Sequence, residues 1–469
     1  MHNNNTNSIP NLSTITTTTT TTTVIPKSFG SFQCDSVDYL LNLSDTQYTP
    51  PHVEHLSDYI NRSDYTNITY GTQCITKLYY INSDIVFLNH GAFGCTFKHA
   101  LQFSHKYSQY IELNTLNYYD RVCLPTLVYC IRQLCQLLHV TKYHCVTLVN
   151  NATTALNSVL TSISHTLTDH DRIVTFNTAY GSVKKMLSNI HQSNTTIHID
   201  YIDIEFPLTD SIVIVQLFQQ YLSQHEQSNT LHTVRYAIFD HISSNTAFIY
   251  PIMQLIQLCH QYNIITIIDG AHACMQLKLN LVELDADIYV SNNHKWLCNT
   301  KGNGFLYVNE KYHPIIHSNI ISHGATSSYS EQFLWHGNDN YSNYVSLLVT
   351  LNIWQNINMS TARVYCNQLL YDATQLLITQ WNTHTLAPID MHSCMICIAL
   401  PDILYNSTIH SSDTVQSLLW SNYSIEVPIK SIQQCNYVRI SVFIYNELNQ
   451  YQILADAMLQ IVALLSDKL

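Results

Sequence analysis

Two residues at the ends of expected strands could form a reactive site. The apolar run Ile264–Ile268 leads directly into Asp269, and the run Ile288–Val290 is soon followed by Lys295. A carboxylate at the end of a buried strand is costly unless a cation or a hydrogen-bond donor meets it. A lysine in such a place loses hydration, which lowers its pKa and makes its neutral amine available as a nucleophile. Taken singly, the acid could cap a helix and the lysine could be a solvated turn residue.

A third strand end could bind a phosphate group. The apolar segment Val146–Val149 turns through Asn150-Asn151-Ala152-Thr153-Thr154 into a helical pattern, so backbone N–H groups and hydroxyls gather at a helix N-terminus. An ordinary threonine cap would have the same sequence. Together, the three strand ends match the needs of pyridoxal phosphate, which requires a lysine for its aldehyde, a carboxylate for its pyridine nitrogen and a site for its phosphate.

The elements around these residues predict an open α/β sheet. Short β-branched runs alternate with longer helical stretches from about residue 100, which is typical of a parallel sheet. Ligands bind beyond the carboxyl ends of the strands of such a sheet, where the three candidate segments lie. The expected strands are Cys145–Val149, Ile173–Phe176, Ile197–Ile204, Val234–Phe239, Ile264–Ile268, Ile288–Val290 and Phe305–Val308, and the expected helices include Thr153–Ser164, Val183–His191 and Met253–Tyr262.

The rest of the chain predicts a leader, an arm and a smaller domain. We expect residues 1–45 to be a disordered low-complexity leader, because Thr16–Thr23 is an unbroken threonine run. Residues 46–100 are expected to form an arm that joins the small domain, residues 101–335 the large cofactor-binding domain, and residues 336–469 the small α+β domain. The small domain is expected from helical patterns near Tyr344–Ile357, Cys366–Trp381 and Asn449–Leu465 and from strand patterns at Met395–Ala399 and Val438–Tyr445.

Composition argues against several classes of protein. Charged residues make up 11% of the 469 residues and the formal net charge is −12, which disfavours binding to nucleic acid. No apolar run reaches the roughly 18 residues of a membrane span, so no membrane contact is expected. The 14 cysteines lack metal-type spacing, which predicts reduced thiols, no metal site and a cytoplasmic protein. Organelle targeting by the threonine-rich leader is the alternative, although this segment contains no arginine.

Seven motifs occur in an order that resembles a known family. They are Leu88-Asn-His-Gly-Ala-Phe-Gly94, Asn151-Ala-Thr-Thr-Ala-Leu-Asn157, Ala179-Tyr-Gly181, Asp240-His-Ile-Ser-Ser244, Asp269-Gly-Ala-His272, His294-Lys-Trp-Leu297 and Ile425-Glu-Val-Pro428. From about residue 80 to residue 465 the chain resembles the class V aminotransferases, and more narrowly their isopenicillin N epimerase-like branch. The resemblance implies a pyridoxal-phosphate-dependent enzyme of fold type I, the aspartate aminotransferase-like fold, with a mostly parallel seven-stranded sheet and a smaller C-terminal domain.

The resemblance also implies roles for individual residues. Lys295 would hold the cofactor as a Schiff base and move the Cα proton, while Asp269 would pair with the pyridinium nitrogen. Tyr180 would lie over the ring, although it could equally serve only in packing. The other cofactor contacts would come from Ala152, Thr153, Ser244, His272, Asn292 and His294, with Asn338 contacting the neighbouring subunit's site in a homodimer that shares its active sites; Asn89 and Arg439 would bind the substrate.

The residues around Arg439 in the sequence also predict a role for it. It is one of seven arginines in the chain and lies in the apolar run Tyr437–Phe443. A buried guanidinium without a neighbouring acid requires a carboxylate, and bidentate binding of a substrate α-carboxylate would supply one. A salt bridge between the domains is the alternative.

The expected reaction takes place at Cα of an amino acid or an amino-acid-like substrate. Removal of the Cα proton by Lys295 is common to epimerisation, β-elimination and transamination. An isopenicillin N epimerase-like activity is expected; the alternatives are a C–S lyase of the cysteine desulfhydrase or hercynylcysteine sulfoxide lyase type and a catalytically silent scaffold dimer. Persulfide-forming desulfuration is not expected, because Cys435 is the only cysteine between Pro428 and Arg439 and lacks a Gly- and His-rich loop.

Overall fold

The computed structural model describes residues 26–66 and 68–466, and a seven-stranded sheet lies at its centre. The strand order is β2-β8-β7-β6-β5-β3-β4, and β8 runs antiparallel to both of its neighbours, while the other pairs are parallel. The prediction of a mostly parallel seven-stranded α/β sheet is confirmed. The strands are β2 (Val146–Val149), β3 (Arg172–Phe176), β4 (His198–Ile202), β5 (Val234–Asp240), β6 (Ile265–Asp269), β7 (Ile288–Asn292) and β8 (Gly304–Val308).

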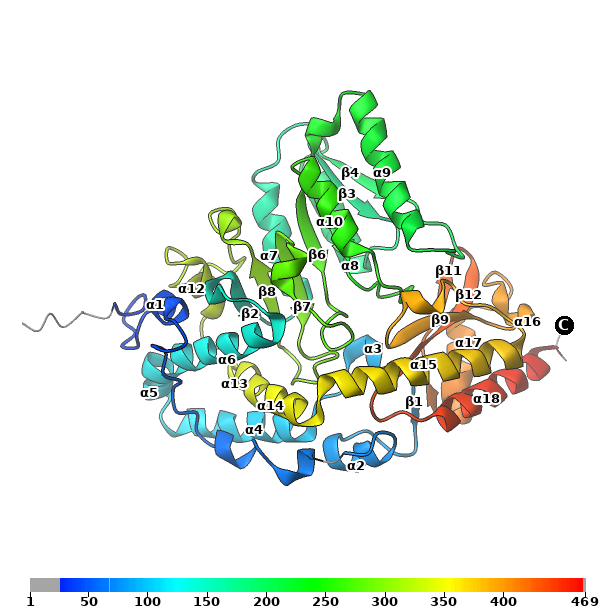
Figure 1. Cartoon of the computed structure of the whole chain (residues 1–469), viewed down its shortest axis with the longest axis horizontal. Helices are drawn as coiled ribbons and strands as arrows, with labels where there is room; N and C mark the ends of the chain where they lie inside the picture. Colours follow the sequence, from blue (N-terminus) through cyan, green and yellow to red (C-terminus); the bar gives the residue numbers. More distant parts are fainter. Residues whose placement is uncertain (1–25, 67, 467–469) are drawn as a thin grey trace, which may run out of the picture.

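Helices cover both faces of this sheet, because its central strands are apolar on both sides. α7 (Ala152–Ser164) and α8 (Gly181–Ser193) pack on one face, and α9 (Ile212–Gln227) and α10 (Ile252–Gln261) pack on the other (Figure 1). Successive residues of a strand enter the two layers in turn: Ile267 belongs to the core under α7 and α8, whereas Ile268 faces the opposite side. The carboxyl ends of the strands therefore form a rigid edge.

The C-terminal part forms a second layered unit, at the right of Figure 1. Its three-stranded sheet, β11-β12-β9, is antiparallel, and Arg439 of β12 lies opposite Cys397 of β9. The long helix α15 leads from the large sheet into this unit, where α18 packs along it. The elements are α14 (Leu347–Ile357), α15 (Met359–Trp381), β9 (Met395–Ala399), α16 (Asp402–Tyr405), α17 (Ser412–Tyr423), β10 (Ile425–Glu426), β11 (Ile429–Ile432), β12 (Cys435–Ser441) and α18 (Leu448–Ser466).

The N-terminal segments lie along the outside of both units. Residues 1–25 of the expected leader lie outside the described part of the chain, whereas α1 (Val37–Asn42) buries Val37 and Leu41, so packed structure begins before the expected boundary at residue 45. The chain then runs beneath α4 (Lys98–Leu113) in Figure 1 and reaches the small unit, where β1 (Val86–Phe87) pairs in parallel with β10. The other helices are α2 (Gln73–Leu78), α3 (His90–Phe93), α5 (Thr115–Asn117), α6 (Cys123–Leu138), α11 (Leu281–Leu284), α12 (Tyr329–Leu334) and α13 (Ser342–Val345).

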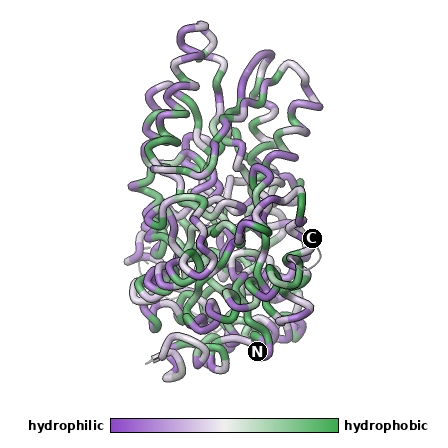
Figure 2. The backbone as a smooth tube through the Cα atoms, turned by 90° about the vertical axis from the view of Figure 1, so that its right-hand side faces the viewer, coloured by the Kyte–Doolittle hydropathy of each residue, from purple (hydrophilic) through white to green (hydrophobic). Residues whose placement is uncertain are grey.

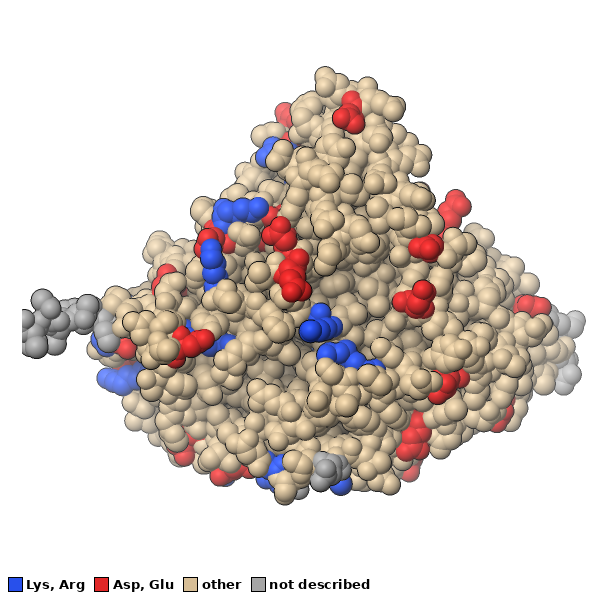
Figure 3. Space-filling view, in the orientation of Figure 1, with Lys and Arg blue, Asp and Glu red and all other residues tan. Residues whose placement is uncertain are grey.

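Charged side chains are sparse on the surface, as the composition predicts. In Figure 3 most of the visible face is neither acidic nor basic, and the charged residues occur in small scattered groups. Figure 2 shows hydrophilic and hydrophobic residues alternating along the chain rather than separating into long segments. Across the residues that the structure describes, none of the helices combines the length and the apolarity needed to cross a bilayer.

Candidate active site

A cavity of about 520 Å³ lies at the carboxyl edge of the large sheet. It is bounded by residues at the ends of β5, β6 and β7 and by the N-terminus of α7, which is where open α/β sheets bind ligands. Asn89, Asn338 and Arg439 are the predicted site residues that lie outside its wall. The other nine line it: Ala152, Thr153, Tyr180, Ser244, Asp269, His272, Asn292, His294 and Lys295.

Lys295 is held in the cavity by His272. The Lys295 Nζ lies 3.0 Å from His272 Nε2, and Trp296 Nε1 donates to His272 Nδ1 at 3.1 Å. An indole N–H can only donate, so Nδ1 is an acceptor and the neutral imidazole carries its proton on Nε2. Because that proton points at the lysine nitrogen, the nitrogen must offer its lone pair. The geometry therefore favours a neutral lysine amine.

The surroundings of the two side chains shift both pKa values toward these protonation states. Burial lowers the pKa of Lys295 to about 8, although the negative charge of Asp269 opposes the shift. Burial also lowers the pKa of His272 well below its usual range, and the positive charge of Lys295 acts in the same direction. A lysine with such a pKa is neutral more often at neutral pH than a solvated lysine, and the neutral amine is the form that a nucleophile or a general base needs.

Asp269 ends β6 and lines the same cavity. Its side chain is buried, and its Oδ1 accepts the backbone N–H of Ala271 at 3.0 Å. Burial raises the pKa of Asp269, while the Ala271 N–H and the charge of Lys295 lower it. A positively charged ligand atom beside this carboxyl would stabilise its ionised form. Asp269 is thus placed to bind a cationic group.

Asp240 is a site residue that the sequence analysis did not select. It ends β5, lies beside Asp269 in the strand register and lines the cavity. The signal was present in the sequence, because Asp240 follows the apolar run Val234–Phe239 in the same way that Asp269 follows Ile264–Ile268. The cavity therefore contains two carboxyl groups at neighbouring strand ends.

The N-terminus of α7 provides a second polar wall. Asn151 caps the helix, with its Oδ1 accepting the N–H of Thr154 at 2.9 Å. Asn292 Oδ1 accepts the N–H of Ala152 at 2.8 Å, so the Nδ2 of Asn292 is the group that remains to donate to a ligand. The positive end of the helix and these donors suit an anion such as a phosphate.

His294 lies beside this wall, and one of its nitrogens is already engaged. His294 Nδ1 lies 3.0 Å from the backbone carbonyl oxygen of Asn303, which can only accept, so Nδ1 carries a proton. Burial lowers the pKa of His294 to about 4, so the ring is neutral and Nε2 has a lone pair. His294 must therefore take up a second proton before it can donate to a phosphate oxygen.

Arg439 is buried without an acidic partner. Its residue is 3% exposed, and it donates to the Ser244 carbonyl and, at 3.4 Å, to Asn89 Oδ1. Its Nε is buried without a hydrogen-bond partner, and the described residues hold no ion pair for it. The alternative of an interdomain salt bridge thus finds no support among them. A buried guanidinium without a counter-ion is suited to bind an anion.

The segment around α3 fixes the backbone of the lysine. His90 Nε2 donates to the Lys295 carbonyl at 3.2 Å, and His90 Nδ1 lies 2.8 Å from the hydroxyl of Tyr445. Gly94 has a φ of +68°, and a Cβ there would lie 2.5 Å from the carbonyl oxygens of His294 and Lys295. Only glycine combines this conformation with so close a contact. The lysine backbone is therefore held from outside its own loop.

Tyr180 and Asn338 are placed differently. Tyr180 immediately precedes α8, lines the cavity and is 40% exposed, so its ring has room to lie over a bound ligand. Asn338 is exposed and does not line the cavity of its own subunit. Its contact with a neighbouring subunit stays a prediction.

Comparison with known proteins identifies the family. A family model described as Aminotransferase class-V matches residues 129–454. The chain belongs to the class V aminotransferase family. The family predicted from the seven motifs is therefore confirmed, and the matched region extends from α6 through the large sheet into α18.

Relatives of this class V chain include several enzymes that cleave C–S bonds. L-cysteine desulfhydrase of Arabidopsis thaliana is 26% identical over 406 residues, covering 80% of this chain and 87% of the relative. Hercynylcysteine sulfoxide lyase of Schizosaccharomyces pombe is 23% identical over 316 residues, covering 65% and 76%. Isopenicillin N epimerase of Streptomyces clavuligerus is 38% identical over 74 residues, covering only 16% and 19%.

Solved structures confirm the expected fold type I architecture of this family member. A cysteine desulfurase from Thermococcus onnurineus NA1 superposes with a TM-score of 0.69 at 16% identity, covering 85% of this chain and 99% of that structure. The cystine C–S lyase C-DES, in a complex with cysteine persulfide, superposes with a TM-score of 0.64 at 17% identity, covering 80% and 97%.

The cysteines near Arg439 do not form a mobile nucleophile. Cys435 begins β12 directly after the two-residue turn of Gln433 and Gln434, whose φ angles of 48° and 66° are typical of a tight hairpin. Four residues along a strand place it about 13 Å from Arg439. Cys397, opposite Arg439, donates to the Asn245 carbonyl at 3.2 Å, and burial raises its pKa to about 12. The geometry thus favours chemistry without a persulfide-carrying cysteine.

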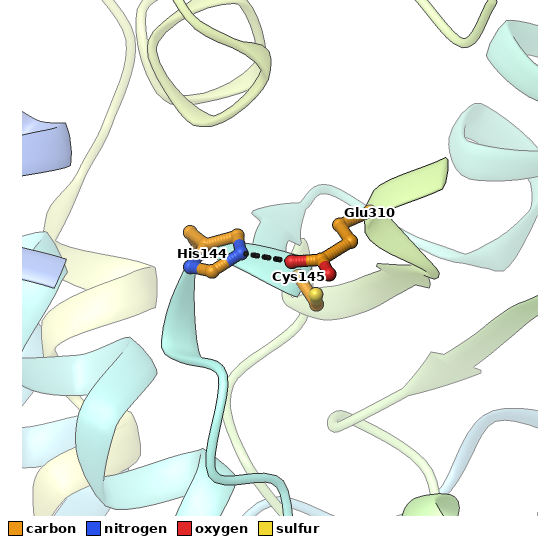
Figure 4. Close-up of side chains that lie close together, drawn as sticks. All are labelled: His144, Cys145 and Glu310. Atoms are coloured by element: carbon orange, nitrogen blue, oxygen red, sulfur yellow. Dashed lines mark hydrogen bonds and ion pairs between the residues drawn. The ribbon is translucent and has the colours of Figure 1, made fainter. Parts of the chain in front are cut away.

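A second group of candidate ligands lies away from the cavity. His144, Cys145 and Glu310 each offer an atom that could bind a metal, and these atoms lie within 4.8 Å of one another (Figure 4). Glu310 Oε2 pairs with His144 Nε2 at 3.2 Å, and Glu310 Oε1 pairs with Lys142. Burial raises the pKa of Cys145 to about 11, so its thiol keeps its proton. Ion pairs of the protein therefore account for this cluster.

Proposed function

We propose that this class V enzyme is a pyridoxal-phosphate-dependent C–S lyase that acts on cysteine or an S-substituted cysteine. The observation that carries the proposal is the buried Lys295 amine, held 3.0 Å from His272 Nε2 in a cavity that Asp269 also lines. Two further observations favour elimination: long stretches of similarity to desulfhydrases and a sulfoxide lyase, and the absence of a mobile cysteine from the described surroundings of Arg439. An isopenicillin N epimerase-like reaction is the second candidate, supported by a short region of higher identity.

The polar groups of the cavity fit pyridoxal phosphate. Lys295 is suited to the aldehyde, Asp269 to the pyridine nitrogen, and the N-terminus of α7 with Thr153 and Asn292 to the phosphate. The cavity also holds a buried carboxyl oxygen, Asp240 Oδ2, that lacks a partner among the described residues. Orphaned buried groups of this kind are typical of functional sites.

Different residues of the chain would take different roles in the elimination reaction. When bound, pyridoxal phosphate supplies an electron sink for the pair left at Cα. Lys295 would take the Cα proton, Arg439 would bind the α-carboxylate and orient the Cα–H bond, and Asp269 would pair with the pyridine nitrogen. Elimination would break the Cβ–S bond, and the sulfur would leave as a thiol with the proton that Lys295 removed. Hydrolysis of the remaining enamine would give pyruvate and ammonia.

The proposal includes a homodimer. Phe93 lines the cavity and is 77% exposed, and Leu113 at the opposite end of α4 and Leu116 of α5 are 81% and 73% exposed. A second subunit that covers these side chains would close the cavity and bring Asn338 to a neighbouring site. Light scattering during size-exclusion chromatography tests this part, and a monomer that retains full activity would contradict it.

We also place the enzyme in the cytoplasm. All fourteen cysteines are free and twelve of them are buried, which fits a reducing compartment. Fractionation of cells that express the full chain tests the location, and recovery in an organelle would contradict it.

The central experiment offers L-cysteine and S-alkyl cysteines to the protein reconstituted with pyridoxal phosphate. We expect the thiol or sulfide and pyruvate to appear in equal amounts, and Lys295→Ala to abolish both. Exchange of the Cα proton for deuterium without loss of sulfur would instead favour the epimerase. A protein that does not develop the absorbance of lysine-bound cofactor would be the silent scaffold.

A further inference from the structure

The two carboxyl groups at the floor of the cavity stand next to each other. Asp240 at the end of β5 is the register partner of Asp269 at the end of β6. Register partners on neighbouring parallel strands point their side chains to the same face of the sheet. Both residues line the cavity, and both are at most 5% exposed. They therefore share one poorly hydrated space.

Their hydrogen-bond partners differ. Asp269 Oδ1 accepts the backbone N–H of Ala271 at 3.0 Å. The backbone N–H of Tyr180 faces Asp240, but Asp240 Oδ2 is buried and has no partner within the described residues. An ionised oxygen left in that state would be strongly destabilised, whereas a protonated one needs only an acceptor. The contacts thus stabilise the charge on Asp269 better than a charge on Asp240.

The other groups that face Asp240 do not make it easier to ionise than Asp269. Lys184 approaches from α8, although its Nζ donates to the Asn177 carbonyl, and Lys295 acts on both carboxyls. The phenol of Tyr250, on the segment after β5, also faces Asp240. Burial and then the charge of Asp269 raise the pKa of Asp240 well above its usual range. Two buried carboxyls side by side do not both ionise readily.

We propose that Asp240 is a positioning residue that keeps a proton, so that Asp269 alone presents negative charge to the pyridine nitrogen. The proposal rests on pyridoxal phosphate as the cofactor, but the protonation of Asp240 belongs to the protein itself.

Infrared difference spectra of the full chain without cofactor at neutral pH test this protonation. We expect the carbonyl stretch of a protonated carboxyl in the wild type and in Asp269→Asn, and its loss in Asp240→Asn. Glu331, whose pKa burial also raises, contributes equally to all three proteins and cancels in the differences. Equal bands in the wild type and in Asp240→Asn, or loss of the band in Asp269→Asn but not in Asp240→Asn, would overturn the proposal. Asp240→Ser gives the same comparison if Asp240→Asn does not fold.

Cofactor binding gives a second readout. Asp240→Asn replaces a neutral acid by a neutral amide, so the dissociation constant of pyridoxal phosphate should change by less than about threefold, whereas Asp269→Asn removes a charge pair and should weaken binding about tenfold or more. The pH at which the spectrum of the bound cofactor changes should be the same in Asp240→Asn and in the wild type. A downward shift would mean that Asp240 is ionised. If no protein binds the cofactor while the infrared pattern holds, the proposed function fails and the protonation of Asp240 stands.

Discussion

Trp296→Phe should raise the pKa of Lys295 without touching the lysine. The indole N–H of Trp296 occupies His272 Nδ1 and thereby keeps the imidazole proton on Nε2, facing the amine. Without this donor the proton can move to Nδ1, and Nε2 then accepts a hydrogen bond from a lysine ammonium. The substitution therefore stabilises the charged form of Lys295.

The size of the effect follows from one hydrogen bond. A neutral hydrogen bond contributes about 0.5–1.5 kcal/mol, which corresponds to about 0.4–1.1 pKa units. The pKa of Lys295, about 8 in the wild type, should therefore rise toward about 9. At neutral pH the population of neutral amine, and with it the rate of attack on an aldehyde, should fall by about two- to twelvefold.

The assay is the rate at which pyridoxal phosphate becomes bound to Lys295 in cofactor-free protein, measured from below to above the wild-type pKa. Trp354→Phe is the matched control, because Trp354 Nε1 donates to the Leu297 carbonyl at 2.9 Å and does not touch His272. The ionisations of pyridoxal phosphate are common to all three proteins, so the comparison isolates the lysine. Overlapping profiles for Trp296→Phe and the wild type, or an equal shift in the control, would refute the reasoning.

Three further predictions concern stability, substrate binding and cofactor binding. Gly94→Ala should lower the free energy of unfolding by about 2 kcal/mol or more in urea titrations, because Gly94 has a positive φ and contacts the lysine loop. Gly181→Ala is the control and should have little effect, because nothing lies within 4 Å of a Cβ at Gly181. Equal losses in the two variants would contradict this prediction. Arg439→Ala should reduce kcat/KM for L-cysteine about 100-fold or more but leave turnover of cysteamine, which lacks the carboxylate, nearly unchanged. A loss that is the same for both compounds would point to misfolding. The affinity for pyridoxal phosphate should fall as the pH rises. His294 has a pKa of about 4 before binding, and it gains a proton when it donates to the phosphate, so its pKa is raised in the complex. His294→Asn should flatten this pH dependence, and an unchanged slope in fluorescence titrations would rule the contact out.

The sheet could be predicted because its strands are short apolar runs bounded by polar residues. Each of the seven expected strands is present, and these strands differ from the prediction only at their ends. α15 begins at Met359 rather than Cys366, since its first turns carry exposed polar residues and Asn358 caps them. α1 was missed because its Val37 and Leu41 are buried by tertiary packing that no local periodicity shows.

Site residues that directly follow a predicted strand could be found from the sequence. Site residues whose role depends on side-chain contacts could not. Lys295 and Asp269 could be selected from their positions alone, and Asp240 could have been selected by the same criterion. The hydrogen bond from Trp296 to His272 and the bond from His90 to the Lys295 carbonyl join residues that only the folded chain brings together. The protonation states of the site depend on these contacts.

The reversed direction of β8 has a consequence for how the nucleophile is assembled. β8 pairs with β7, and Asn292 of β7 lies opposite Gly304 of β8. The loop that carries Lys295 therefore connects two strands that are neighbours both in the sequence and in the sheet. A loop closed between close neighbours loses little chain entropy on ordering, whereas Asp269 and the phosphate wall meet only after long crossovers are complete. The reactive amine thus lies on a loop between strands that pair over a short sequence separation. The groups that would bind the cofactor come from strands that pair over longer separations.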